Sequence, residues 1–294
     1  MSLDLDAAIS FLTTHGRTLE RRRLRHLLGE GSADEVLQAL DAHRNVDGGY
    51  GWALEPDLRS VTSQPVAAMH ALEVLAGIPD TTSRRGPELL DWLAGHSRAD
   101  GGVPFALPYS DTDGSAPHWI NADPAASSLQ MTTQLAAQAH RLARHRTDIA
   151  EHPWLKTATT YCLDAIEQTP STPSAYEVMF AMHFLDAAAP VSPRASALLG
   201  TFVQHVRVDG PTPVAGGAEG EVLQLLDFTP HPESPSRALL DRDAVTADLK
   251  RLAGRQRPDG GWDVTFTAFS PAAALEWRGY ATVQAVAVLR DNPR

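Results

Sequence analysis

The chain has 294 residues, a formal net charge of −11 and 43% hydrophobic residues, the proportions of a water-soluble protein with a sizeable core. The negative charge argues against nucleic acids and anionic membrane surfaces as partners, since both need a basic surface. The sequence contains no apolar run of about 18 residues, so we predict no membrane span. The single cysteine, Cys162, excludes an intramolecular disulfide, and the first residues lack a secretory signal, so we predict a cytoplasmic protein.

Helical periodicity predicts six pairs of helices along the chain. In one such helix, Ala33, Val36, Leu37 and Leu40 recur at i, i+3, i+4 and i+7 and form one apolar face. The second helix of each pair is more apolar, and 281–289 is apolar almost all round. In chain order, the predicted pairs cover 3–14 with 18–29, a helix from 32 with 64–76, 87–96 with 125–145, 153–167 with 174–187, 194–207 with 219–227, and 243–256 with 274–290.

Each pair therefore combines an amphipathic helix with a mostly apolar one. The economical arrangement places the apolar helices in an inner ring and the amphipathic helices outside them. We predict an all-α fold, an (α/α)6 barrel or toroid of about twelve helices in two concentric rings. No change in composition divides the chain, so we predict a single domain over 1–294.

The clearest repeated motif is an Asp-Gly-Gly corner. Full copies stand at 47–49, 100–102 and 259–261, and Asp209-Gly210-Pro211 is a degraded copy. The first two copies are 53 residues apart, and Asp259 follows Asp209 by 50 residues. A fixed period in this range is typical of stacked or closed arrays of one supersecondary unit.

These corners resemble the QW repeats of the terpenoid cyclases. The sharpest copy is 257–262, in which Gln256 precedes Trp262 by six residues, and the helices that follow the corners at 47 and 259 share an Ala-Leu-x-Val-Leu-like segment. The likeness covers the whole chain as a repeat pattern, with three sharp copies. It implies membership of the α/α-toroid superfamily of squalene–hopene cyclase and the protein-prenyltransferase β subunit, close to short bacterial proteins with such repeats.

The resemblance also implies functional motifs, and the chain departs from them. Class II cyclases carry DxDD as the acid that protonates an alkene, whereas the nearest string here, Asp111-Thr112-Asp113-Gly114, lacks the last Asp and lies in a Pro- and Ser-rich loop. There is no DDxxD for Mg²⁺, and a single cysteine does not provide the zinc site of the prenyltransferases. We expect no metal and no cofactor, with Mg²⁺ needed only if the substrate is a diphosphate.

Toroid geometry suggests further candidates, because the loop between each corner and its inner helix, together with the first turn of that helix, faces the central cavity. Aligning 71–75 on 285–289 sets Gln64 against Arg278 and puts charged and aromatic side chains at equivalent rims. Protonating an alkene needs a neutral carboxylic acid, and aromatic rings stabilise a cation by about 0.5–2 kcal/mol each. The alternative interpretation is structural: the charged residues form salt bridges at the loop ends, and the tryptophans fill the barrel. The candidate acids are Asp57, Glu55, Asp113, Asp111 and Glu276, and the candidate substrate-binding residues are Trp52, Arg59, His118, Trp119, Trp277, Arg278 and Tyr280.

Three functions fit this pattern. The first is a terpene-cyclase-like isomerase that acts on a hydrophobic isoprenoid, although an aromatic content of 6% is modest for a polycyclase. The second is a non-catalytic toroid that binds a hydrophobic ligand or a protein partner. The third is a carbohydrate-active (α/α)6 enzyme with paired carboxylates such as Asp57 and Glu276. Fold alone does not choose among them, and the sequence gives no signal for an oligomeric state.

Overall fold

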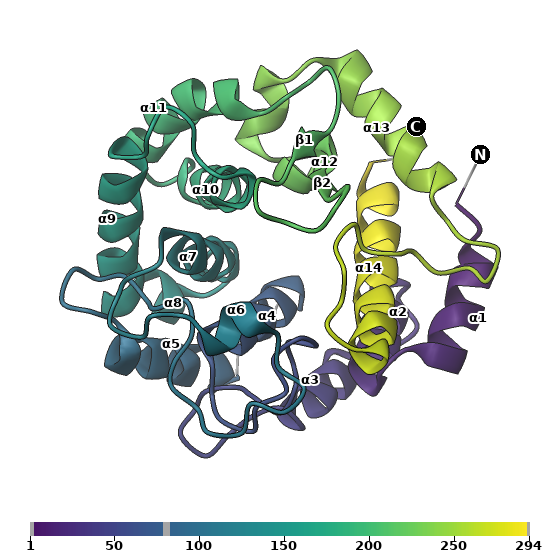
Figure 1. Ribbon diagram of the computed structural model, residues 1–294, viewed down its shortest axis with the longest axis horizontal. Helices are drawn as coiled ribbons and strands as arrows, with labels where there is room; N and C mark the ends of the chain where they lie inside the picture. The colour runs from purple at the N-terminus through teal and green to yellow at the C-terminus, as the bar shows by residue number, and fades with distance from the viewer. Residues whose placement is uncertain (1–2, 79–82, 293–294) are drawn as a thin grey trace. The chain divides into compact units, whose positions relative to one another are not determined.

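The computed structural model describes residues 3–78 and 83–292 (Figure 1). Over these ranges the chain is helical apart from loops and one hairpin of two short strands with two residues each, which confirms the predicted all-α class. The α-helices are α1 (Leu5–His15), α2 (Thr18–Leu27), α3 (Ala33–Asp41), α4 (Pro65–Gly77), α5 (Arg85–His96), α6 (Pro117–Ile120), α7 (Leu129–Ala143), α8 (Thr147–Ala150), α9 (Pro153–Glu167), α10 (Ala175–Ala188), α11 (Pro193–Phe202), α12 (Leu225–Phe228), α13 (Arg242–Gly254) and α14 (Pro271–Asp291). The remaining elements are the 3-10 helices η1 (Val203–His205) and η2 (Pro235–Leu239) and the strands β1 (Thr212–Pro213) and β2 (Val222–Leu223).

The contacts along the chain define two units, which are described separately. Unit 1 comprises the described residues of 1–39 and 203–294, and unit 2 comprises those of 40–202. The predicted single domain over 1–294 stays a prediction.

Unit 2 is organised around three helices that run side by side. The middle helix, α7, packs against α4 on one flank and α10 on the other (Figure 1). Helix α9 packs behind α7, α5 contacts α4 and α9, and α11 contacts α10 and α9. Every residue of α4 from Pro65 to Leu75 is buried, as the apolar character of 64–76 predicts for an inner helix.

Unit 1 joins the two ends of the chain. Helix α14 packs against α1 and α2, and α13 packs against α14. The shared core contains Phe11 and Leu12 from α1, Trp262 from the third corner and Val286 from α14. The last helix pair is therefore in direct contact with the first, as the closed array predicted from the repeat requires.

The three full Asp-Gly-Gly corners have the same structure. The first glycine of each, Gly48, Gly101 or Gly260, has a φ of 88°, 91° or 95°, a conformation that favours glycine. The aspartate side chain accepts a hydrogen bond from the N–H of the second glycine at 2.9, 3.0 and 3.1 Å. This shared geometry shows that the repeats are structurally equivalent corners.

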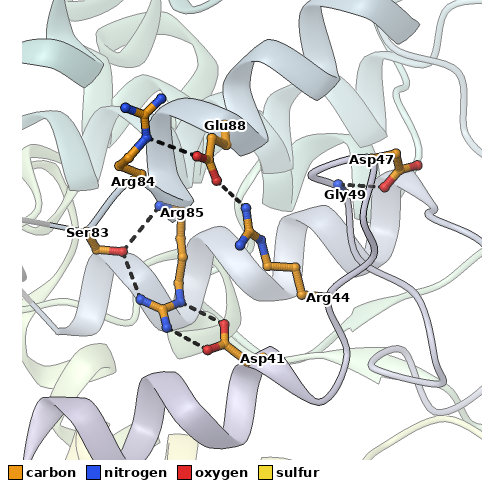
Figure 2. A network of polar contacts seen from close by, with 8 residues as sticks. All are labelled: Asp41, Arg44, Asp47, Gly49, Ser83, Arg84, Arg85 and Glu88. Carbon is orange, nitrogen blue, oxygen red and sulfur yellow. Dashed lines mark hydrogen bonds and ion pairs between the residues drawn. The ribbon is translucent and has the colours of Figure 1, made fainter.

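Each corner is packed against the next outer helix. A Cβ added to the second glycine would come within 3 Å of Trp92 on α5, Tyr161 on α9 or Phe11 on α1 in the three copies. At the first corner, Arg44 pairs with Glu88, and Arg85 of α5 pairs with Asp41 at 2.5 Å (Figure 2). The corners therefore join neighbouring repeats, so their aspartates have a structural function.

The fifth repeat departs from the prediction. Asp209 is exposed and contacts Arg207, and no helix spans 219–227. The antiparallel hairpin β1–β2 and the four-residue helix α12 occupy this region instead. Gly220 has a φ of 78°, which a continuous right-handed helix does not allow, so the predicted helix 219–227 is wrong.

Candidate functional site

Three buried side chains form a polar cluster in unit 2. Glu55 comes from the loop before α4, and His70 and Glu73 stand about one turn apart on α4 itself. Nε2 of His70 lies 2.8 Å from Oε2 of Glu55, and Nδ1 of His70 lies 4.0 Å from Oε2 of Glu73. The exposed fractions of Glu55, His70 and Glu73 are 3%, 6% and 8%. The imidazole is thus placed to exchange a proton with Glu55 in a site that is shielded from solvent.

Asp57 completes the surroundings of Glu55. Its backbone N–H donates to Oε1 of Glu55 at 3.2 Å, so both oxygens of Glu55 have a defined neighbour. The Asp57 carbonyl accepts a hydrogen bond from the Ala116 N–H at 2.8 Å, and Asp57 is itself buried. The two carboxyls predicted from this loop, Glu55 and Asp57, are therefore enclosed together.

A long loop lies against this part of the molecule. We call residues 104–120 the cover segment; they follow the second corner and include α6. Oε1 of Gln64 accepts from the Leu107 N–H at 2.9 Å, and Nε2 of Gln64 donates to the Leu107 carbonyl at 3.2 Å. The Arg59 N–H donates to Oγ of Ser115 at 3.2 Å. With the bond from Ala116 to Asp57, the cover segment is attached to the loop of the candidate acids at three points.

The cover segment also carries an aromatic group. The rings of Phe105 and Trp119 are stacked with centroids 4.6 Å apart, and the His118 ring lies 4.8 Å from that of Trp119. Trp119 is buried, whereas His118 is exposed. Of these two predicted substrate-binding residues, only Trp119 is enclosed near the acid-bearing loop.

The remaining candidates of unit 2 are more exposed. Trp52 has a φ of 52° and a side chain that is 51% exposed, and its Nε1 donates to Oδ1 of Asn45 at 2.7 Å. Arg59 is half-buried against Gly114 of the cover segment. Asp111 and Asp113 are exposed, whereas Glu55 and Asp57 are buried.

The candidates of unit 1 lie on helix α14, within the predicted helix 274–290. Helix α14 begins at Pro271, behind the N-cap Ser270, and so it already includes Glu276 and Arg278. Arg278 pairs with Asp259 at 2.8 Å and with Asp263 at 2.7 Å, and its guanidinium lies 4.5 Å from the centre of the Phe11 ring. Arg278 thus stabilises the third corner, and it lies about one turn further into the helix than the predicted start at 274 implies.

The other three candidates of unit 1 also contact side chains of their own unit. Glu276 lies 3.9 Å from Arg17. The Trp277 ring meets Phe266 edge to face at 5.1 Å and Tyr280 at 5.5 Å, and the guanidinium of Arg23 lies 5.8 Å from the centre of the Tyr280 ring. These contacts give α14 a mixed aromatic and charged face within unit 1.

Sequence reasoning missed part of the polar cluster and an aromatic row. His70 and Glu73 are polar residues in the otherwise apolar segment 65–76, and this exception was the available signal. On α10, Tyr176, Phe180 and His183 are spaced at i, i+4 and i+7, with ring centroids 6.2 and 5.9 Å apart along the row. All three are partly exposed on a helix that is otherwise largely buried.

The described ranges were compared with the requirements of a metal site, a reactive thiol and a membrane-spanning helix. Among those residues, no group of three or more His, Cys, Asp or Glu side chains is arranged to hold a metal ion. Cys162 is fully buried, and burial raises the pKa of its thiol well above the usual value. No helix in the described part of the chain combines the length and apolar character needed to cross a bilayer.

Comparison with known proteins finds similarity at the level of the fold. No protein-family profile and no curated protein sequence matches the chain. The structure is similar to the type II terpene cyclase MstE from Scytonema, solved as an arginine-to-alanine variant with geranylgeranyl dihydroxybenzoate as substrate: the TM-score is 0.56 and the identity 13%, over 98% of this chain and 97% of the other. An aspartate-to-asparagine variant of MstE with the same substrate gives a TM-score of 0.53 at 13% identity, over 97% and 96% of the two chains.

A second solved protein, from Actinoplanes, is equally similar. It matches with a TM-score of 0.56 and 14% identity over 98% of each chain. At these identities the likeness concerns the fold alone. The chain therefore has the terpenoid-cyclase-like α/α-toroid fold that the corner repeats predict.

Proposed function

We propose that this chain is a terpene-cyclase-like enzyme that isomerises a hydrophobic isoprenoid-type molecule by protonating one of its double bonds. The single observation that carries the proposal is the buried hydrogen bond between Glu55 and His70, with Glu73 beside the imidazole. The fold supports it, because the similar MstE structures contain a geranylgeranyl substrate.

The proposed reaction begins with Glu55 as the acid. Its carboxyl transfers a proton to one carbon of a C=C bond, the π electrons form the new C–H bond, and the other carbon becomes a cation. A second C=C bond of the same molecule attacks that cation and closes a ring. Loss of a proton from a neighbouring carbon restores a double bond, so the product is an isomer of the substrate.

The neighbouring side chains have defined parts in this proposal. His70 returns a proton to Glu55 after each turnover, and Asp57 is the alternative acid. The rings of Phe105, Trp119 and Phe180 are the candidates for stabilising the cation, each by about 0.5–2 kcal/mol. We propose a substrate without a diphosphate and a reaction that uses no metal, since the acid supplies the proton directly.

Isotope incorporation tests the proposal directly. The purified chain is incubated in D₂O with geranylgeranyl dihydroxybenzoate or with geranylgeraniol, and products are separated by mass spectrometry. We expect a cyclised isomer that carries one deuterium. Glu55→Gln is expected to lower turnover about a thousandfold without weakening substrate binding, whereas the exposed control Asp113→Asn keeps wild-type turnover.

Two results would contradict this assignment. Wild-type turnover in both Glu55→Gln and Asp57→Asn would show that the acid lies elsewhere. Tight binding of the probe without any deuterated product would favour a non-catalytic toroid that holds a hydrophobic ligand.

A further inference from the structure

The cover segment contains two buried polar atoms that lack a hydrogen-bond acceptor or donor. Oη of Tyr109 and Nε1 of Trp119 are both enclosed by protein, and neither forms a hydrogen bond. A buried polar group without a partner destabilises the conformation that buries it, because it gives up its hydrogen bonds to water. Both atoms belong to the same cover segment, so their cost falls on the conformation in which this segment is closed.

Specific hydrogen bonds attach the cover segment to the neighbouring loop. It is held to the acid-bearing loop through Leu107, Ser115 and Ala116, which bond to Gln64, Arg59 and Asp57 respectively. At its start, Pro104 pairs with Ser127, next to the N-cap of α7. Opening therefore requires these three attachments to break, and Pro104 can remain in place.

We propose that the cover segment is a gate that opens to admit a hydrophobic ligand to Glu55 and Asp57. In the open form, water satisfies Tyr109 and Trp119. In the closed form, the three attachments to the acid-bearing loop offset that gain, so we propose that the two forms are close in free energy. The identity of the ligand rests on the proposed function, whereas the opening itself does not.

Hydrogen–deuterium exchange of the whole chain tests the opening. Tyr109→Phe removes the unpaired hydroxyl and keeps the ring, so we expect the amides of 105–120 to exchange about tenfold more slowly than in the wild type. Tyr50→Phe is the matched control, because Oη of Tyr50 is also buried and unpaired but lies at the first corner, outside the cover segment. It should leave the exchange of 105–120 relative to the rest of the chain unchanged.

A second variant is expected to change the exchange rate in the opposite direction. Gln64→Ala removes both hydrogen bonds to Leu107 and should speed the exchange of 105–120 about tenfold, again relative to the rest of the chain. Urea unfolding of each variant supplies the global stability used for this comparison. If Tyr109→Phe slows the cover segment no more than Tyr50→Phe does, or if Gln64→Ala leaves it unchanged, the segment is not a poised gate.

The association rate of geranylgeranyl dihydroxybenzoate tests what the gate admits. We expect the rate constant to fall about tenfold in Tyr109→Phe and to rise in Gln64→Ala. Slowed exchange with an unchanged association rate would show that the ligand does not pass the cover segment, which overturns the gating role. If this probe binds to no variant, the proposed function fails, while the exchange result still decides whether the segment opens.

Discussion

The same position of the repeat is used differently in the two units. Gln64 in unit 2 and Arg278 in unit 1 align through the segments 71–75 and 285–289. Helix α4 begins directly after Gln64, whose side chain reaches to Leu107 in the cover segment. Helix α14 begins seven residues before Arg278, whose side chain turns back to Asp259.

The difference in helix start decides where a charged side chain goes. In unit 2, the chain between the corner and α4 remains a loop, and it folds so that Glu55 and Asp57 are buried. In unit 1, the extension of α14 places Glu276 and Arg278 on a helical face, where both form ion pairs. At the aligned position, Gln64 therefore holds the cover segment in unit 2, whereas Arg278 forms a clamp at the corner in unit 1. If this distinction is correct, changes to the unit 1 clamp alter stability and leave turnover intact.

The largest effect is expected from Gly260→Ala in the unit 1 corner. A Cβ at Gly260 would lie 2.0 Å from the Ala7 carbonyl oxygen, and the residue has a φ of 95°. Backbone strain and overpacking together should lower the free energy of unfolding by about 3 kcal/mol. Urea unfolding measures the change.

Two other glycines calibrate this prediction. Gly48 in the unit 2 corner shares the left-handed φ, but its added Cβ would be 3.2 Å from the Glu88 carbonyl oxygen, so Gly48→Ala should cost about 1.5 kcal/mol. Gly210 has no atom within 4 Å of such a Cβ and should tolerate alanine. Equal losses at Gly260 and Gly48 would show that the unit 1 corner is no tighter than its counterpart.

The next effect concerns a partly buried acid in unit 1. Burial raises the pKa of Asp227 to about 6, and the nearby charge of Asp248 contributes to the rise. The hydrogen bond from the Gln224 N–H and the charge of Arg251 lower it, but burial has the larger effect. The folded chain therefore holds this proton more tightly than the unfolded chain, and the stability that it contributes is lost as the pH rises from about 4 through 6. Asp227→Asn, which cannot ionise, should be more stable than the wild type by about 2 kcal/mol at pH 7 and similar to it near pH 4.

This variant also tests whether a raised pKa alone marks an active acid. Asp227 accepts the Gln224 N–H at 2.7 Å as a helix cap, a bond that the asparagine oxygen retains. We expect wild-type turnover from Asp227→Asn, in contrast to Glu55→Gln. A large loss of turnover in Asp227→Asn would identify an acid in unit 1 instead of Glu55. A stability difference between variant and wild type that is constant with pH would show that Asp227 does not titrate in this range.

A smaller effect is expected from Arg278→Gln. The substitution removes the ion pairs to Asp259 and Asp263 and should destabilise the chain by about 1 kcal/mol, because these carboxylates are partly solvated. Chemical denaturation in low and high salt measures it, since salt weakens the wild type more than the variant. Substrate affinity should stay the same, and a selective loss of affinity would restore Arg278 as a substrate-binding residue.

Much of the fold could be predicted because the repeat and the helical periodicity are local. The predicted helix 153–167 coincides with α9, and 174–187 lies within one residue of α10. The corners at 47, 100 and 259 were recognisable because only glycine fits their φ and their contact with the next helix. The fifth repeat failed because its glycines break a helix without completing the Asp-Gly-Gly signature.

The candidate site was harder to predict because it depends on long-range contacts. Loop position singled out Glu55 and Asp57 as candidates before α4, and this stays a prediction; it did not reveal that His70 pairs with Glu55 across 15 positions in sequence. Nor did it separate the buried Trp119 from the exposed His118, since this depends on how the cover segment folds onto Gln64 and Asp57. On α14, the predicted helix 274–290 already contained the candidates, but it began three residues late because Ser270 and Pro271 were not recognised as the cap and first residue.

The smallest effect is expected at the surface of the unit 2 corner, from Arg85→Lys. Nε and the terminal nitrogen Nη2 of Arg85 donate to the two oxygens of Asp41 at 2.7 and 2.5 Å (Figure 2). Lysine keeps the charge but not the two parallel bonds, and the pair is partly exposed, so the loss should be about 0.5 kcal/mol. Thermal unfolding of Arg85→Lys beside Arg278→Gln compares the two corners directly. A loss at Arg85 as large as that at Arg278 would show that unit 2 depends on its corner as much as unit 1 does, and that the two corners differ only in what their loops carry.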